Sequence, residues 1–149
     1  MIKLLKKIFT TQGRLNRLPY NMYSFALLAI SFVTIFLMSM LQGVASTIEP
    51  ISALAFALLA FVVGIMAFIG QVTLTIRRLH DLNLSGWYYL LYIILSTLPA
   101  VIYNEESLTM MLIALAITLI SLILPLFVIF KRGTVGENKY GSDPLSEAV

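Results

Sequence analysis

The chain has 149 residues, of which 60% are hydrophobic and 11% are charged, and its formal net charge is +3. Ordinary globular chains hold roughly 45–50% apolar and roughly 25% charged residues, so this composition excludes a soluble domain and indicates a membrane protein. The basic balance does not indicate a nucleic-acid binder, because the Lys and Arg residues fall into three clusters beside hydrophobic runs and not into one stripe.

Residues 1–18 predict a cytoplasmic interfacial helix followed by a basic loop. At 100° per residue, the apolar side chains of residues 1–9 fill one arc of a helix and the lysines fill the rest. Such a helix lies in the membrane interface, with its lysines against anionic headgroups. The alternative is a basic flank that only orients the first span. The apolar region that follows is too long for a cleavable signal peptide, so we interpret it as an uncleaved membrane helix.

Four apolar runs predict a membrane bundle over residues 19–130, with spans at about residues 20–41, 51–76, 86–103 and 108–130. A span needs roughly 20 apolar residues, and the third run is the shortest. In the second run, small residues repeat on one helix face that ends at Gln71 and Thr75, which favours close packing of a neighbouring helix and a hydrogen bond across that seam. The stretch from Arg77 to Tyr89 is interpreted as a polar loop, and residues 131–149 as a turn-rich cytoplasmic tail.

The distribution of charge predicts the orientation. Four spans place the N-terminus, the central loop and the C-terminus on one side, and these segments carry 5, 2 and 3 Lys or Arg, which is all ten. The two opposite loops carry only glutamates. Because the Lys/Arg bias of short loops sets orientation, both termini are expected to be cytoplasmic. The predicted fold is an all-α integral membrane protein with four transmembrane helices, an amphipathic N-terminal interfacial helix, and N-in/C-in topology.

The topology allows the polar motifs to form one cytoplasmic cap over the bundle. Its guanidinium groups suit phosphate or carboxylate, and its acidic and amide side chains would be their partners. The favoured interpretation is that the arginines orient the chain and form structural ion pairs, and the alternative is a site for an anion or a lipid headgroup. The candidate residues of the cap are Arg14, Arg17, Arg77, Arg78, His80, Asp81, Trp87, Asn138, Tyr140 and Asp143.

No catalytic, metal-binding or cofactor-binding residue is predicted. Adjacent helical residues do not face each other, so His80 and Asp81 are not interpreted as a catalytic dyad. One histidine with scattered carboxylates matches no metal-ligand spacing, and the tail lacks a phosphate-loop motif. The absence of cysteine excludes a disulfide framework and a cysteine nucleophile. Coupled transport is disfavoured, because no ionisable residue lies inside a predicted span.

Three motifs resemble one family when taken in order. They are Gly13-Arg14-x-x-Arg17-x-x-Tyr20, Arg77-Arg78-Leu79-His80-Asp81 running to Ser85-Gly86-Trp87, and Gly133-Thr134-x-Gly136-x-Asn138-x-Tyr140-Gly141-x-Asp143-Pro144. The chain resembles the bacterial inner-membrane family known as domain of unknown function 805, the YhaH-like proteins. The departures are Tyr20, where Phe or Trp is usual, and Pro19, where an acidic residue is common. The resemblance implies a small multi-span protein of the bacterial inner (cytoplasmic) membrane and no particular activity.

Two functional hypotheses remain. The first is a non-catalytic scaffold or accessory protein whose cytoplasmic cap binds a partner or anionic lipid. The second is a small transporter or channel, or a lipid-acting enzyme, that uses the arginine-lined cap. The expected partners are the bilayer and anionic lipid headgroups, with a homo-oligomer or a membrane protein partner also compatible; neither nucleic acid nor a cofactor is expected.

Overall fold

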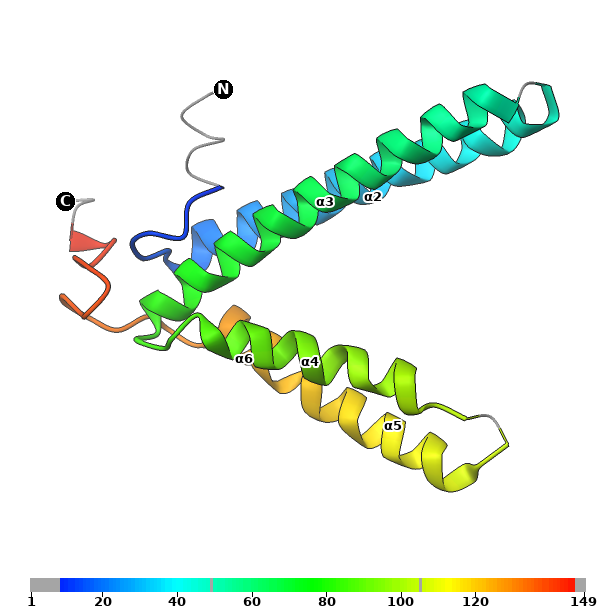
Figure 1. The fold of residues 1–149 in the computed structure, drawn as a ribbon. Coiled ribbons are helices and arrows are strands. Elements are labelled where there is room, and N and C mark those ends of the chain that lie inside the picture. Colours follow the sequence, from blue (N-terminus) through cyan, green and yellow to red (C-terminus); the bar gives the residue numbers. More distant parts are fainter. Residues whose placement is uncertain (1–8, 49, 105, 147–149) are drawn as a thin grey trace. The chain divides into compact units, whose positions relative to one another are not determined.

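A computed structural model describes residues 9–48, 50–104 and 106–146, and this part of the chain is helical with no strand. The elements in chain order are α2 (Arg17–Ile48), α3 (Pro50–Asp81), α4 (Trp87–Ile102), α5 (Leu108–Ser121) and α6 (Ile123–Phe130) (Figure 1). The chain divides into two compact units. The first contains residues 21–74 and the second contains residues 11–20 with residues from 75 onward. The predicted interfacial helix falls, apart from its last residue, outside the described residues.

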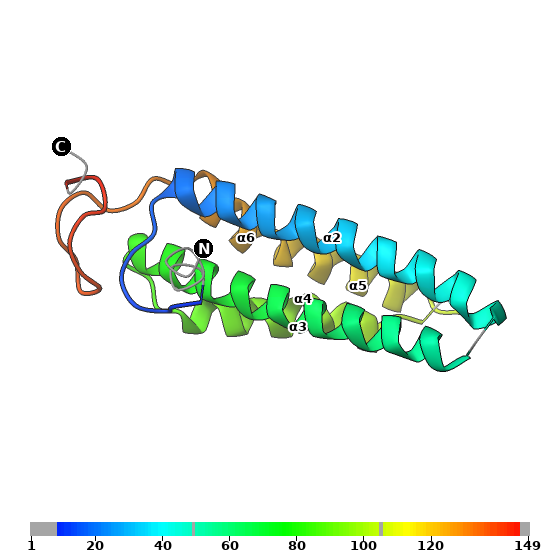
Figure 2. The ribbon, with the colours of Figure 1, turned by 90° about the horizontal axis from the view of Figure 1, so that it is seen from above.

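The first unit contains most of α2 and most of α3, which lie alongside one another and run in opposite directions (Figures 1 and 2). Gln71 in α3 donates from Nε2 to Ser24 Oγ in α2 over 3.2 Å, so the predicted polar link between helices on this face is present. The predicted close approach is absent at Gly64, since a Cβ there would meet nothing within 4 Å. Hydroxyl groups inside α2 bond to their own helix: Ser31 Oγ donates to Leu27 O, which satisfies a polar group in apolar surroundings.

In the second unit, α4 and α5 contact each other as an antiparallel hairpin, and α6 continues from α5 after an interruption at Leu122. Pro125 explains that interruption. A proline has no N–H to donate to the carbonyl four residues earlier, and its ring clashes with that carbonyl. The carbonyl concerned belongs to Ser121, where α5 ends. At its other end α5 is capped by Ser107, whose side chain accepts from Met110 N–H.

The helices have membrane-compatible lengths with one exception. Within the described residues, three apolar stretches are long enough to cross a bilayer: Arg17–Ala45, Ala53–Asp81 and Leu108–Phe130, the last including both α5 and α6. At 1.5 Å per residue the 16-residue α4 is about 24 Å long, which is shorter than a hydrocarbon core of about 30 Å. Only 6% of an apolar 18-residue stretch within Ala53–Asp81 is buried inside the protein, as expected for a surface that faces lipid.

α3 extends past the predicted end of the second span. Arg77–Asp81, interpreted from the sequence as loop, forms the last turns of this helix, and only residues 82–86 connect it to α4. The helix ends in a Schellman motif: Leu84 N–H donates to Leu79 O at 2.8 Å and Asn83 N–H donates to His80 O at 3.0 Å. Asn83 has a φ of +59°, the left-handed conformation that this cap requires.

Candidate functional site

The centre of the site is a buried carboxylate shared by two arginines. Asp81, the last residue of α3, is 2% exposed, and Arg78 is completely buried. Arg14 donates from Nε and Nη2 to Asp81 Oδ1 over 3.2 and 3.1 Å. Arg78 donates from Nη1 to Asp81 Oδ2. Residues three apart lie on one helix face, which places Arg78 and Asp81 together, whereas Arg14 reaches them from the segment before α2.

The remaining donors of both arginines bond to backbone carbonyls. Arg78 Nε donates to Val128 O over 3.0 Å and its Nη2 donates to Lys131 O, at the end of α6. Arg14 donates to the carbonyls of Gly136 and Thr134. Carbonyls at a helix C-terminus have no partner in the helix, and a buried guanidinium supplies donors to several of them at once. The two guanidinium groups therefore hold the chain after α6 against the end of α3.

Residues 131–146, which we name the C-terminal segment, close over this cluster. Thr134 donates from both its N–H and its Oγ1 to Asp81 O, over 2.9 and 3.0 Å. Asn138 Nδ2 donates to His80 O and to Thr134 Oγ1, over 3.0 and 2.9 Å. Gly133 passes so close that a Cβ on it would lie 2.1 Å from Asp81 Oδ2. Only glycine fits there with the neighbours as they stand.

Asp143 organises the far end of the C-terminal segment. Its Oδ1 accepts from Leu145 N–H and its Oδ2 accepts from Gly136 N–H, over 2.9 and 2.8 Å. These two bonds favour the ionised carboxylate and lower the pKa of Asp143 from its ordinary value of 3.8. Gly136 has a φ of +79°, a conformation in which glycine carries no steric cost.

The segment before α2 is also fixed to the end of α3. Leu15 N–H donates to Arg77 O over 3.1 Å, and Arg77 Nη2 donates to Arg14 O over 3.4 Å. His80 Nδ1 lies 3.3 Å from Gly13 O. The His80 ring stacks on Tyr140 with 3.9 Å between ring centroids and 7° between ring planes.

The structure thus brings together eight of the ten candidate residues of the cap. They are Arg14, Arg77, Arg78, His80, Asp81, Asn138, Tyr140 and Asp143. Arg17 lies at the edge of this group, where its Nη1 donates to Phe130 O over 3.2 Å. Trp87 is 75% exposed at the start of α4. The sequence does not predict Gly133 and Thr134 as contacts of Asp81, and the only signal for them is their place in the third family motif.

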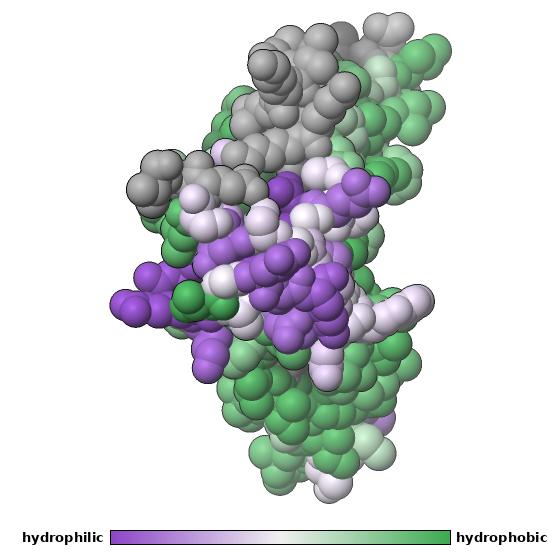
Figure 3. Space-filling view, turned by 90° about the vertical axis from the view of Figure 1, so that its left-hand side faces the viewer, coloured by the Kyte–Doolittle hydropathy of each residue, from purple (hydrophilic) through white to green (hydrophobic). Residues whose placement is uncertain are grey.

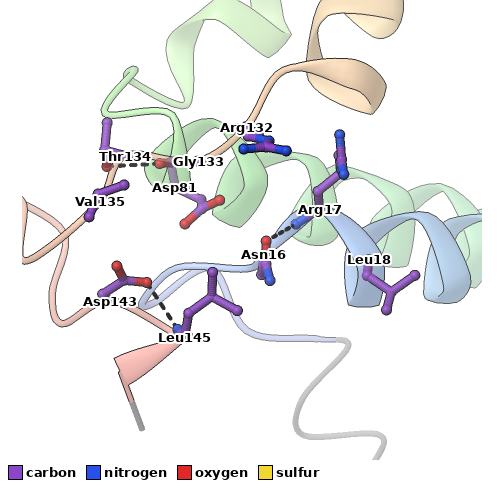
Figure 4. A pocket seen from close by; sticks show the side chains of 10 residues that line it. All are labelled: Asn16, Arg17, Leu18, Asp81, Arg132, Gly133, Thr134, Val135, Asp143 and Leu145. Atoms are coloured by element: carbon purple, nitrogen blue, oxygen red, sulfur yellow. Dashed lines mark hydrogen bonds between the residues drawn. The ribbon is translucent and has the colours of Figure 1, made fainter. Parts of the chain in front are cut away.

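A cleft of about 350 Å³ opens beside the cluster (Figure 4). Arg17 and Arg132, both exposed, contribute to its wall from opposite ends of the chain. The full lining is Asn16, Arg17, Leu18, Asp81, Arg132, Gly133, Thr134, Val135, Asp143 and Leu145. Figure 3 shows the surface coloured by hydropathy. Hydrophilic side chains gather there in one patch, and apolar surface borders the patch. Among the described residues, no three His, Asp or Glu side chains group as metal ligands.

Known proteins resemble the chain over nearly its whole length. A model of the family described as "Protein of unknown function (DUF805)" matches residues 8–142. Two proteins called "Inner membrane protein YhaH", from Escherichia coli strain K12 and from Escherichia coli O157:H7, are each 27% identical over 148 residues. The match covers 98% of this chain and 96% of each relative. No solved structure matches the chain at a significant level.

Proposed function

The chain belongs to the DUF805 family of proteins of unknown function, as its motifs predict, and from that premise we propose a non-catalytic membrane protein whose cytoplasmic cap associates with anionic lipid headgroups. The cap consists of residues 11–20, residues 77–86 and the C-terminal segment. The proposal includes residence in the bacterial inner membrane with both termini cytoplasmic. The name of the Escherichia coli relatives and the membrane-length helices support that location.

The charge balance of the cap carries the proposal. Its three segments hold seven Lys or Arg and three Asp or Glu. The buried Asp81 is already shared by Arg14 and Arg78, so it neutralises no charge at the surface. Four cations are exposed: Arg17, Lys131, Arg132 and Lys139. A basic residue near an anionic membrane surface contributes about 1 kcal/mol of attraction, so four together favour anionic lipid appreciably.

A non-catalytic role is supported by the way the titratable side chains are used. Asp81 accepts from two guanidinium groups, and the His80 ring lies between the Gly13 carbonyl and the Tyr140 ring. Both side chains hold segments of the chain together. A general acid or base needs access to a proton of the substrate, and a carboxylate that is 2% exposed and doubly paired has none.

Thermal unfolding of the purified protein in a neutral detergent tests the lipid proposal. Added phosphatidylglycerol is expected to raise Tm more than added phosphatidylcholine, because a ligand that binds only the folded state stabilises it. The difference should shrink at about 1 M salt, where the Debye length is about 3 Å. A variant in which glutamine replaces Arg17, Lys131, Arg132 and Lys139 should show the same Tm shift with both lipids. Equal shifts for both lipids would overturn the proposal and turn attention to a protein partner.

A further inference from the structure

We infer that the cleft between Arg17 and Arg132 binds the phosphodiester group of one phospholipid headgroup. The inference rests on the proposed function and sharpens it, because general attraction to an anionic surface needs no particular site, whereas this cleft holds one lipid at a defined place. Three features of the cleft support the assignment: its two arginines, its apolar edge and its remaining carboxylate.

The two arginines come from segments that are far apart in the chain. Arg17 is the first residue of α2, and Arg132 is the second residue after α6, yet both line the cleft (Figure 4). Arg17 donates from Nη1 to Phe130 O over 3.2 Å, a bond that holds its side chain against the end of α6. A guanidinium has five N–H donors, so this single bond leaves a fork that matches two oxygens of a phosphate.

The apolar edge places the cleft at the level of a headgroup. Leu18, which lines the cleft and follows Arg17, is 66% exposed and begins a charge-free run that continues to Ile48. Phe130, the last residue of α6, is 69% exposed. Each exposed apolar side chain therefore stands next to a basic residue at the point where a membrane-length helix begins or ends. A phosphate held by the arginines would leave its acyl chains to enter the apolar layer at this level.

The carboxylates that line the cleft limit which headgroups it can bind. Asp81 is paired with Arg14 and Arg78, which leaves Asp143 as the charge opposing an anion. That charge disfavours a doubly charged phosphate more than a singly charged diester. Each oxygen of Asp143 accepts one backbone N–H and has a further lone pair. A glycerol hydroxyl or an ethanolamine ammonium can donate to it, whereas choline carries no such donor.

Native mass spectrometry of the full chain, released from micelles doped with phosphatidylglycerol, tests the inference. The site variant is R17Q/R132Q. The matched control is K131Q/K139Q, which lowers the general attraction of the cap by the same two charges but leaves the lining of the cleft unchanged. Wild type and control should each retain one phosphatidylglycerol, and the site variant should bind it about tenfold or more weakly, a loss of about 1.4 kcal/mol or more. Tm in detergent without lipid verifies that both variants fold.

The outcomes separate this inference from the proposed function. Equal loss of lipid in both variants would overturn the cleft as a site while leaving general attraction of the cap intact. No retention by wild type, together with no lipid-dependent Tm shift, would overturn both. Displacement by soluble glycerophosphoglycerol at an equal concentration would show a site for the free diester and not for a lipid. Equal retention of phosphatidylcholine would overturn the assigned role of Asp143.

Discussion

At the scale of single residues, the most consequential arrangement is the carboxylate of Asp81 between Arg14 and Arg78. Removing two or three charges from water is costly, and attraction between them offsets that cost only when the remaining donors and acceptors are also satisfied. Here the spare donors reach carbonyls from residue 128 to residue 136. The pairing therefore matters less for its own energy than for the segments of the chain that it holds together.

Asp81→Asn should lower the free energy of unfolding by about 3–5 kcal/mol, because it leaves two buried guanidinium groups without a counter-charge. Chemical unfolding in detergent, followed by circular dichroism, measures the change. Lys139→Gln is the control: Lys139 is exposed, and a surface substitution should stay within about 0.5 kcal/mol. An Asp81→Asn protein as stable as wild type would show that the cluster contributes nothing to folding.

Gly133→Ala should displace the C-terminal segment, since the added Cβ would overlap Asp81 Oδ2. Overpacking of this kind costs about 1–3 kcal/mol, and limited proteolysis should cut the segment faster than in wild type. Gly64→Ala is the matched control, because its Cβ meets nothing within 4 Å. At that position alanine should stabilise the helix by about 0.5–1 kcal/mol. Unchanged cleavage in Gly133→Ala would contradict the close contact.

The order of the C-terminal segment should depend on pH through Asp143. The hydrogen bonds from Leu145 and Gly136 lower its pKa below 3.8, so the folded state binds this proton less readily than the unfolded state does. Their contribution to stability is complete above pH 3.8 and is lost as the pH falls through the lower, folded pKa. The protection factors of the Gly136 and Leu145 amides against hydrogen exchange should fall over that range. In Asp143→Asn the protection factors of these amides should not change over that range.

The residues of the cap show what a sequence can reveal about such a site. Charge placement and topology assign Arg14, Arg77, Arg78 and Asp81 to the same side of a membrane, and the structure brings them together. The close approach of Gly133 to a carboxylate follows from how the chain after α6 docks, which no local pattern encodes. The two arginines of the cleft are likewise far apart in the sequence, so no short motif contains both.

At the scale of elements, breaks in hydrogen bonding explain where the helices end. The charge-free runs predict the helices well because apolar helices satisfy their own backbone groups in lipid. The predicted end of the second span at residue 76 marked where charge begins, but the helix continues to Asp81 because Arg78 and Asp81 satisfy each other on one face. Charge thus marks the edge of the apolar stretch, whereas the helix itself ends at Asp81, two residues before the left-handed Asn83.

Pro125→Ala should join α5 and α6, because residue 125 gains an N–H for the carbonyl of Ser121. Hydrogen–deuterium exchange should show a newly protected amide at residue 125 and slower exchange at Leu122. Pro19→Ala provides the control. Pro19 is the third residue of α2, where an N–H has no acceptor within the helix. Rapid exchange at residue 125 would mean that another feature interrupts the helix.

At the scale of the whole molecule, the orientation is open to direct measurement because the chain contains no cysteine. Ser142→Cys is expected to react with an impermeant maleimide only after the cytoplasmic side is opened. Ser107→Cys, before α5, should react from the outside of intact spheroplasts. The two positions are separated by α5 and α6, so labelling of both from one side would exclude a crossing by that stretch. The alkylation pattern would then replace the charge-based topology.

The contacts of Arg78 also impose an order on biosynthesis. Its carbonyl partners at Val128 and Lys131 follow it by 50 and 53 residues, so the arginine leaves the ribosome before they do. Until those two residues are synthesised, Asp81 is the only one of the groups bonded to Arg78 that is available to it. Before then the guanidinium has fewer protein partners than in the folded chain, and a chain terminated after α5 would lack the two carbonyls. Full burial of this charge is thereby coupled to the synthesis of α6 and Lys131.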